Sequence, residues 1–183
     1  MRVKTALMLL VLTVSFAGAA RGQDTSNAKE FAHGNGTVEF EDKVSNFSFS
    51  AIRQKDGTVK GNLVYNQRSA VNPQNNISVH LRINCLTIVG KTATVQGVIT
   101  KADPEFVLLD PNDPASRFDL VGAAASITVQ DEITNQTTGE VTDLASSLII
   151  TGAPVGCQAI YPPFMYRTTN VVVRSATATA ASK

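Results

Sequence analysis

The chain has 183 residues, with sixteen Lys and Arg against fifteen Asp and Glu, a formal net charge of +1 and no tryptophan. Without a basic cluster, such a near-neutral chain lacks the electrostatic footprint of a protein that binds nucleic acid or anionic lipid. Its length predicts one ordinary domain that is large enough to bury a sizeable core.

The first 22 residues have the pattern of a secretory signal peptide. Arg2 and Lys4 precede an apolar run from Ala6 to Phe16, and small residues follow as far as Gly22. The run is too short to span a bilayer, so cleavage after Ala19 or Gly22 is expected. We therefore expect a secreted or periplasmic protein without a membrane span. Residues 23–33 are predicted to be a flexible N-terminal segment, 34–174 a single β domain and 175–183 a disordered Ala/Thr tail.

Apolar and polar residues alternate with the period of β-strands through most of the mature chain. The first expected hairpin turns at Asp56-Gly57, a pair suited to the positive φ angles of a tight turn. The next expected strand, 77–85, places its apolar side chains and Cys85 on one face, and the phase slips near Cys85-Leu86, which predicts a β-bulge. Gly97, inside the following strand, indicates a bend or a close approach of two backbones.

The later elements are less regular. Residues 106–109 are expected to form an edge strand or a helical turn, and further strands are expected over 118–129, 144–151 and 170–174. Strands joined by hairpin-sized connections predict an all-β antiparallel meander. We expect it to close as an up-and-down β-barrel in which the strand near Val38 meets the strand near Val172, with a β-sandwich as the alternative.

The chain has two cysteines, Cys85 and Cys157. In an oxidising compartment an even pair most simply forms one disulfide, and the alternative is two separate buried thiols. Neither cysteine has a Cys, His or carboxylate at metal-ligand spacing, which argues against a catalytic or metal-binding thiol.

Few residues in the sequence suggest a catalytic or ligand-binding role. His33 and His80 are expected at the surface, and no nucleophile elbow, zinc helix or phosphate-binding loop is present, so neither a catalytic residue nor a cofactor is predicted. Asp110, Asp113 and Asp119 are weak calcium candidates, for which ordinary solvated loops are the simpler explanation. Tyr161, Phe164 and Tyr166 form the densest aromatic stretch, which is either a contact patch or a plug at one end of the barrel.

Several stretches resemble small exported bacterial proteins of unknown function. The resemblance lies in the glycine-rich 34–37, the Phe-alternating hairpin 47–63, the strands around 86–95 and an ending in Asn170-Val171-Val172-Val173. It implies secretion and an all-β fold and assigns no site residues. The acidic segment 103–119 departs from the pattern.

We therefore expect an exported, non-enzymatic β-domain with a binding or structural role at the cell surface or in the periplasm. The alternatives are a carrier that holds a small apolar ligand in a barrel cavity and, less favoured, a barrel enzyme. A carrier needs interior room, and the small residues Gly97 and Ala123 to Ala125 mark where such room would lie. The partner is either a protein or a small apolar ligand.

Overall fold

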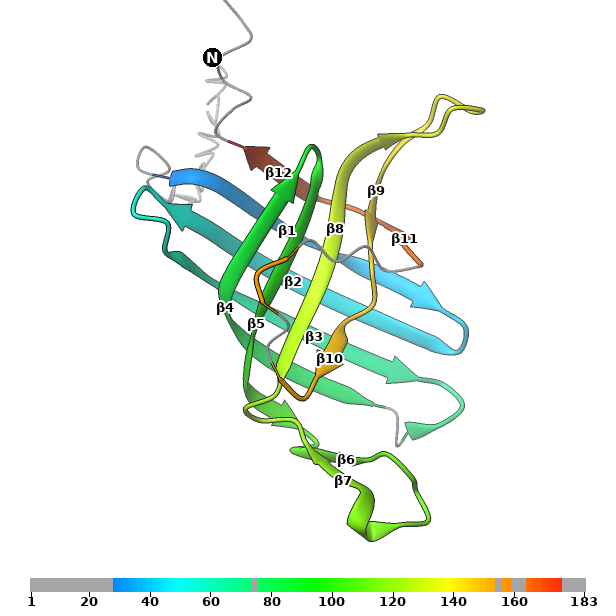
Figure 1. The fold of residues 1–183 in the computed structure, drawn as a ribbon. Coiled ribbons are helices and arrows are strands. Elements are labelled where there is room, and N and C mark those ends of the chain that lie inside the picture. The colour runs from blue at the N-terminus through cyan, green and yellow to red at the C-terminus, as the bar shows by residue number, and fades with distance from the viewer. Residues whose placement is uncertain (1–27, 74–75, 154–155, 159–163, 176–183) are drawn as a thin grey trace, which may run out of the picture.

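A computed structural model of the chain describes residues 28–73, 76–153, 156–158 and 164–175 (Figure 1). The predicted signal peptide, the tail beyond Ser175 and Tyr161 lie outside the described residues. Within the described residues, no helix is long and apolar enough to cross a membrane.

The described chain is built almost entirely of antiparallel strands. In chain order they are β1 (Ala28–Phe40), β2 (Lys43–Gln54), β3 (Val59–Ser69), β4 (Ile77–Val89), β5 (Thr92–Asp103), β6 (Phe106–Leu108), β7 (Arg117–Asp119), β8 (Ala124–Thr134), β9 (Val141–Ala145), β10 (Ile149–Thr151), β11 (Tyr166–Thr168) and β12 (Val171–Ser175). Strand β1 starts at Ala28, before the expected domain start at Gly34, so 28–33 belong to the sheet rather than to a flexible segment.

Ten of these strands form one meander sheet that curls into a barrel (Figure 1). The order is β11-β9-β8-β5-β4-β3-β2-β1-β12, with β10 on the edge of β8, while β6 and β7 form a separate small hairpin. Strand β1 pairs with β12, where His33 lies opposite Val172, as the predicted barrel closure requires. The sheet ends at β11 and β12 leave one seam between the two edges incompletely paired.

The interior follows from the alternation in the sequence. Alternate residues in the middle of β2, β3 and β4 are buried in the interior, and the largest of these side chains include Phe47, Phe49, Leu63, Tyr65, Leu81 and Ile83. The turn predicted at Asp56-Gly57 is confirmed, because Gly57 has a φ of +85° and donates its N–H to Gln54 O at 3.0 Å.

The bulge predicted near Cys85-Leu86 is present in β4. The register shifts between Ile83 and Cys85, so Cys85 pairs with Gln96 and Leu86 with Val95. This shift gives the core position to Leu86 and turns Cys85 to the outer face, in contrast to the prediction that Cys85 shares the inward face of Ile83. The bulge thereby makes Cys85 available for a bond outside the barrel.

Two expected strands are each divided in the structure. Gly122, with a φ of +91°, turns the chain between β7 and β8, so 118–129 is not one strand. The expected strand 144–151 is split into β9 and β10, which pair with opposite ends of β8. In both cases apolar composition continues through a bend that periodicity alone does not reveal.

A disulfide joins Cys85 to Cys157, whose Cα atoms are 5.4 Å apart across a sequence separation of 72 residues. It fixes the segment after β10 to the outer face of β4. Gln96 donates a hydrogen bond from Nε2 to Gln158 O at 3.1 Å beneath the same segment. Polar residues on the outer face of β5 and β8 are buried here, namely Thr94, Gln96, Ser126 and Thr128.

Candidate functional site

Two carboxylates bridge part of the barrel seam. Asp131 and Asp143 accept hydrogen bonds through Oδ2 from the backbone N–H groups of Val173 and Val171, each at 2.9 Å. A register shift between Gln130 and Ile133 displaces Asp131 from the ladder of β8 and β9. Charged carboxylates accept such bonds strongly, so these two side chains replace the carbonyl groups of a missing neighbouring strand.

The other part of the seam, between β1 and β11, stays open. Strand β2 pairs with β1 as far as Phe40, whereas the pairing of β12 with β1 ends at Gly34. Beyond it, Asn35 donates its N–H to Asn170 O at 3.3 Å. Along the rest of β1, no described strand pairs with the edge that faces β11.

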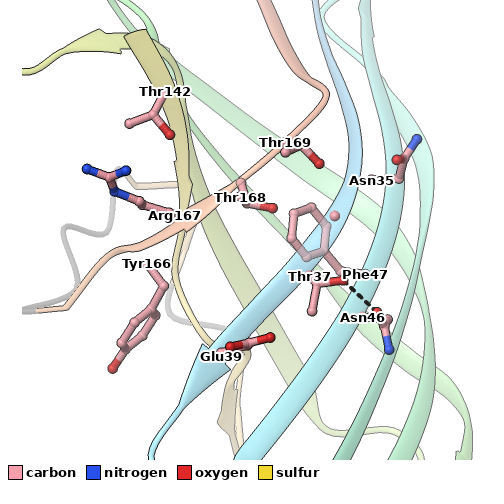
Figure 2. A pocket seen from close by; sticks show the side chains of 11 residues that line it. Asn35, Thr37, Glu39, Asn46, Phe47, Thr142, Tyr166, Arg167, Thr168 and Thr169 are labelled. Atoms are coloured by element: carbon pink, nitrogen blue, oxygen red, sulfur yellow. Dashed lines mark hydrogen bonds between the residues drawn. The ribbon is translucent and has the colours of Figure 1, made fainter. Parts of the chain in front are cut away.

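An open groove of about 810 Å³ lies along this unpaired edge (Figure 2). Strands β1 and β2 form one wall and β9, β11 and the residue after it form the other. The lining is mostly neutral and polar, and it consists of Asn35, Gly36, Thr37, Glu39, Asn46, Phe47, Thr142, Tyr166, Arg167, Thr168 and Thr169. On the first wall the hydroxyl of Thr37 donates a hydrogen bond to Asn46 Oδ1 at 2.8 Å.

The closed end of the groove lies where Thr168 meets Gly36. A Cβ added at Gly36 would lie 2.0 Å from Thr168 Oγ1 and 3.3 Å from the ring of Phe47. Only a residue without a side chain therefore allows β11 to approach β1 here. The Thr168 hydroxyl is buried and has no hydrogen-bond partner within the described structure. A buried polar group of this kind costs free energy at the seam.

The charges around the groove are unequal at its two ends. Arg167 is neutralised by Glu140, with Nη1 and Oε1 2.8 Å apart. At the other end, Glu39 lines the groove, and Glu41 and Asp42 follow it in the β1–β2 turn. A hydrogen bond from the Ser69 hydroxyl lowers the pKa of Asp42, which keeps that carboxylate charged at neutral pH. The turn end of the groove is therefore acidic.

Tyr166 connects the groove with the barrel interior. Its ring lies 5.2 Å from that of Phe40, and it packs against the core. Deeper inside, the Tyr65 hydroxyl donates a hydrogen bond to Ser45 Oγ at 2.8 Å. Burial raises the pKa of Tyr65 above its ordinary value, because a charged phenolate has little access to water there.

Two residues of the aromatic stretch, Phe164 and Tyr166, lie within the described residues. Tyr166 is partly buried against the core, while Phe164 is 64% exposed. Exposed apolar side chains also occur on the β6–β7 hairpin, where the guanidinium of Arg117 lies 4.1 Å from the centre of the Phe106 ring.

The calcium candidates serve as turn and surface residues. Asp110 Oδ1 accepts the N–H of Asn112 at 2.9 Å. Asp113 caps the short 3₁₀ helix Pro114–Ser116, and Asp119 forms an exposed ion pair with Arg117 at 2.7 Å. In the described ranges, no three His, Cys, Asp or Glu side chains come together in a way that could hold a metal ion.

Both histidines are exposed on the outer face, and the ring of His33 stacks on Phe31 with centroids 5.7 Å apart.

Sequence reasoning missed the groove and the two seam carboxylates. The only signal for the carboxylates is that Asp131 and Asp143 lie among several acidic residues around β8 and β9.

No protein-family model matches the chain, and no curated protein or solved structure is significantly similar to it.

Proposed function

We propose that the protein is an exported, non-enzymatic binding domain that acts at the cell surface or in the periplasm, and that its partner binds in the seam groove. The observation that carries this proposal is the groove, which is open on the outside of the barrel and has an unpaired strand edge along one wall. An unpaired strand edge can pair with another chain, and most sheets cover or shorten such edges. An unpaired edge beside an open groove therefore favours the binding of a partner.

The roles of the titratable groups support binding rather than catalysis. Asp131 and Asp143 are engaged with backbone N–H groups, Asp113 caps a helix, and Glu132 forms an exposed ion pair with Lys91. Catalytic acids and bases need a reacting group within hydrogen-bond reach, whereas these groups are used to hold the fold.

Export is supported by the N-terminal sequence and by the disulfide, a bond that persists in oxidising compartments. The intact mass of protein recovered from outside the cytoplasm tests this step. We expect a chain that starts near Gln23 and gains the mass of two hydrogens on reduction. A full-length reduced chain confined to the cytoplasm overturns the proposal.

A carrier of a small apolar ligand has less support. The space beside Gly97 is taken by the backbone of β4, since a Cβ there would lie 2.3 Å from Arg82 O. The interior is occupied by large buried side chains such as Tyr65 and Leu86.

Binding is tested by sedimentation of the purified mature protein with envelopes of the cell that makes it. Thr169→Trp fills the groove from an exposed position, and Asn62→Trp places the same side chain on an exposed part of β3 away from the groove. We expect the wild type and Asn62→Trp to sediment with the envelopes and Thr169→Trp to remain in solution. A wild type that stays in solution, or a Thr169→Trp that sediments equally, overturns the proposal.

A further inference from the structure

The geometry points to an extended peptide with a basic residue as the ligand of the groove, bound as an added strand along β1 from Thr37 to Phe40. This inference rests on the proposed function and names the chemical class of the partner. It follows from the direction of the backbone groups on β1, the shape of the seam and the charges at its end.

The backbone of β1 presents unused hydrogen-bonding groups to the groove. In an antiparallel strand the N–H and C=O of one residue point to the same edge, and neighbouring residues alternate. The N–H of Asn35 points toward β12, because it bonds to Asn170 O. Thr37 and Glu39 therefore point their N–H and C=O groups to the same side, where no described strand pairs with them.

The seam has the shape that an added strand needs. Gly36 and Thr168 are in contact, and from there β11 leaves the direction of β1 toward Tyr166 (Figure 2). The edge over residues 36–40 is about 17 Å long at the usual rise of about 3.4 Å per residue. A short extended segment entering here would continue the barrel sheet with main-chain hydrogen bonds, the recognition mode called β-augmentation.

The negative charge at the turn end of the groove favours extended peptides that carry a basic residue. Glu39 lines the turn end of the groove and forms no ion pair within the described residues, while Arg167 is already paired with Glu140. A Lys or Arg side chain at the matching end of the peptide complements this charge and increases its association rate. The neutral Thr37, Asn46 and Thr142 side chains line the rest of the path without demanding a second charge.

A peptide fits these observations better than a saccharide. A saccharide would use the hydroxyl and amide side chains of the lining, but it would leave the regularly spaced N–H and C=O groups of Thr37 and Glu39 without strand partners. A peptide backbone matches that spacing along its whole length.

The first experiment screens the mature, disulfide-bonded protein against a phage-displayed library of linear peptides. Selected sequences are expected to be rich in β-branched residues and to contain Lys or Arg. With a synthetic peptide of a selected sequence, we expect the amide protons of Thr37 and Glu39 to become protected from hydrogen exchange. Protection confined to another strand overturns the inference.

A second experiment tests main-chain pairing directly. N-methylation of alternate peptide residues removes one hydrogen-bond donor at a time, and the set of residues that face β1 is expected to bind about tenfold more weakly per methyl group. On the protein, Thr37→Pro removes a donor that faces the groove, while Thr37→Val keeps it. We expect loss of binding in the first variant and near wild-type affinity in the second.

The outcomes separate this inference from the proposed function. If Thr169→Trp abolishes sedimentation with envelopes but no library peptide binds, the groove is a binding site and the peptide inference fails. It also fails if N-methylation has no effect, or if neutral oligosaccharides displace the envelopes and peptides do not. If a peptide binds along β1 while envelopes do not bind at all, the peptide inference stands and the surface role fails.

Discussion

The carboxylate of Asp131 accepts a hydrogen bond from the backbone N–H of Val173 across the barrel seam, 2.9 Å away. Asp131 is 5% exposed, so water cannot replace the bond if the carboxylate is removed. The side chain thus joins the middle of the chain to its last described strand. Its closest equivalent in an ordinary sheet is a backbone carbonyl of a paired neighbour.

Asp131→Ala leaves the N–H of Val173 buried without a partner, and we expect it to lower the free energy of unfolding by about 1–3 kcal/mol. Asp119→Ala is the matched control, because its ion pair with Arg117 is exposed and is expected to contribute less than about 1 kcal/mol. Urea denaturation measures both. Equal small losses in the two variants would show that the seam bond contributes little.

The disulfide is expected to contribute about 4 kcal/mol, because it closes a long loop in the unfolded chain. Cys85→Ala combined with Cys157→Ala should lower the urea midpoint of unfolding accordingly. The wild type in reductant should match the double variant, and reductant should leave the double variant unchanged. A double variant as stable as the oxidised wild type would contradict this prediction.

Because the Tyr65 hydroxyl is buried, we expect the protein to lose stability in alkali. The pKa of Tyr65 is raised in the folded state by burial, so the folded protein keeps this proton at a pH where the unfolded chain has lost it. The stability that the protonated Tyr65 contributes is fully present below the pKa of about 10 that a tyrosine has in the unfolded chain. It is lost progressively as the pH rises above that value. Tyr65→Phe removes this group together with its hydrogen bond to Ser45. The stability difference between the wild type and Tyr65→Phe should narrow above about pH 10; a constant difference would contradict the prediction.

Gly36 and Thr168 form a pair suited to a double-mutant cycle. Gly36→Ala places a methyl group against Thr168 Oγ1 and should be destabilising. Thr168→Ala removes a buried hydroxyl without a partner and should be neutral or stabilising. The combined variant should recover much of the loss of Gly36→Ala. If the two effects simply add, the contact at the closed end of the groove is not the cause.

The parts of the fold that were predicted correctly depend on neighbours in the sequence. Asp56-Gly57 specifies its own turn, and the slip in alternation at Cys85-Leu86 marks its own bulge. Gly97 was correctly associated with a close backbone approach, and the same contact leaves no room beside it for the carrier alternative.

The seam could not be predicted because its contacts join distant segments. Asp131 and Val173 are 42 residues apart, and an acidic residue near a strand end has no local pattern that distinguishes a seam bond from a solvated loop. Strand β11 has only three residues, too few for alternation to be detected. Because β11 was not predicted, neither the unpaired edge of β1 nor the groove beside it could be predicted from the sequence.

The pairing of β1 with β12 means that the barrel closes between the first and the last of its described strands. Strand β1 begins at Ala28 and must wait for residues 171–175 before its second edge is covered. A chain with such distant partners folds slowly compared with one made of local contacts. Closure of the barrel is therefore a long-range step, separate from the formation of the local hairpins between β1 and β5.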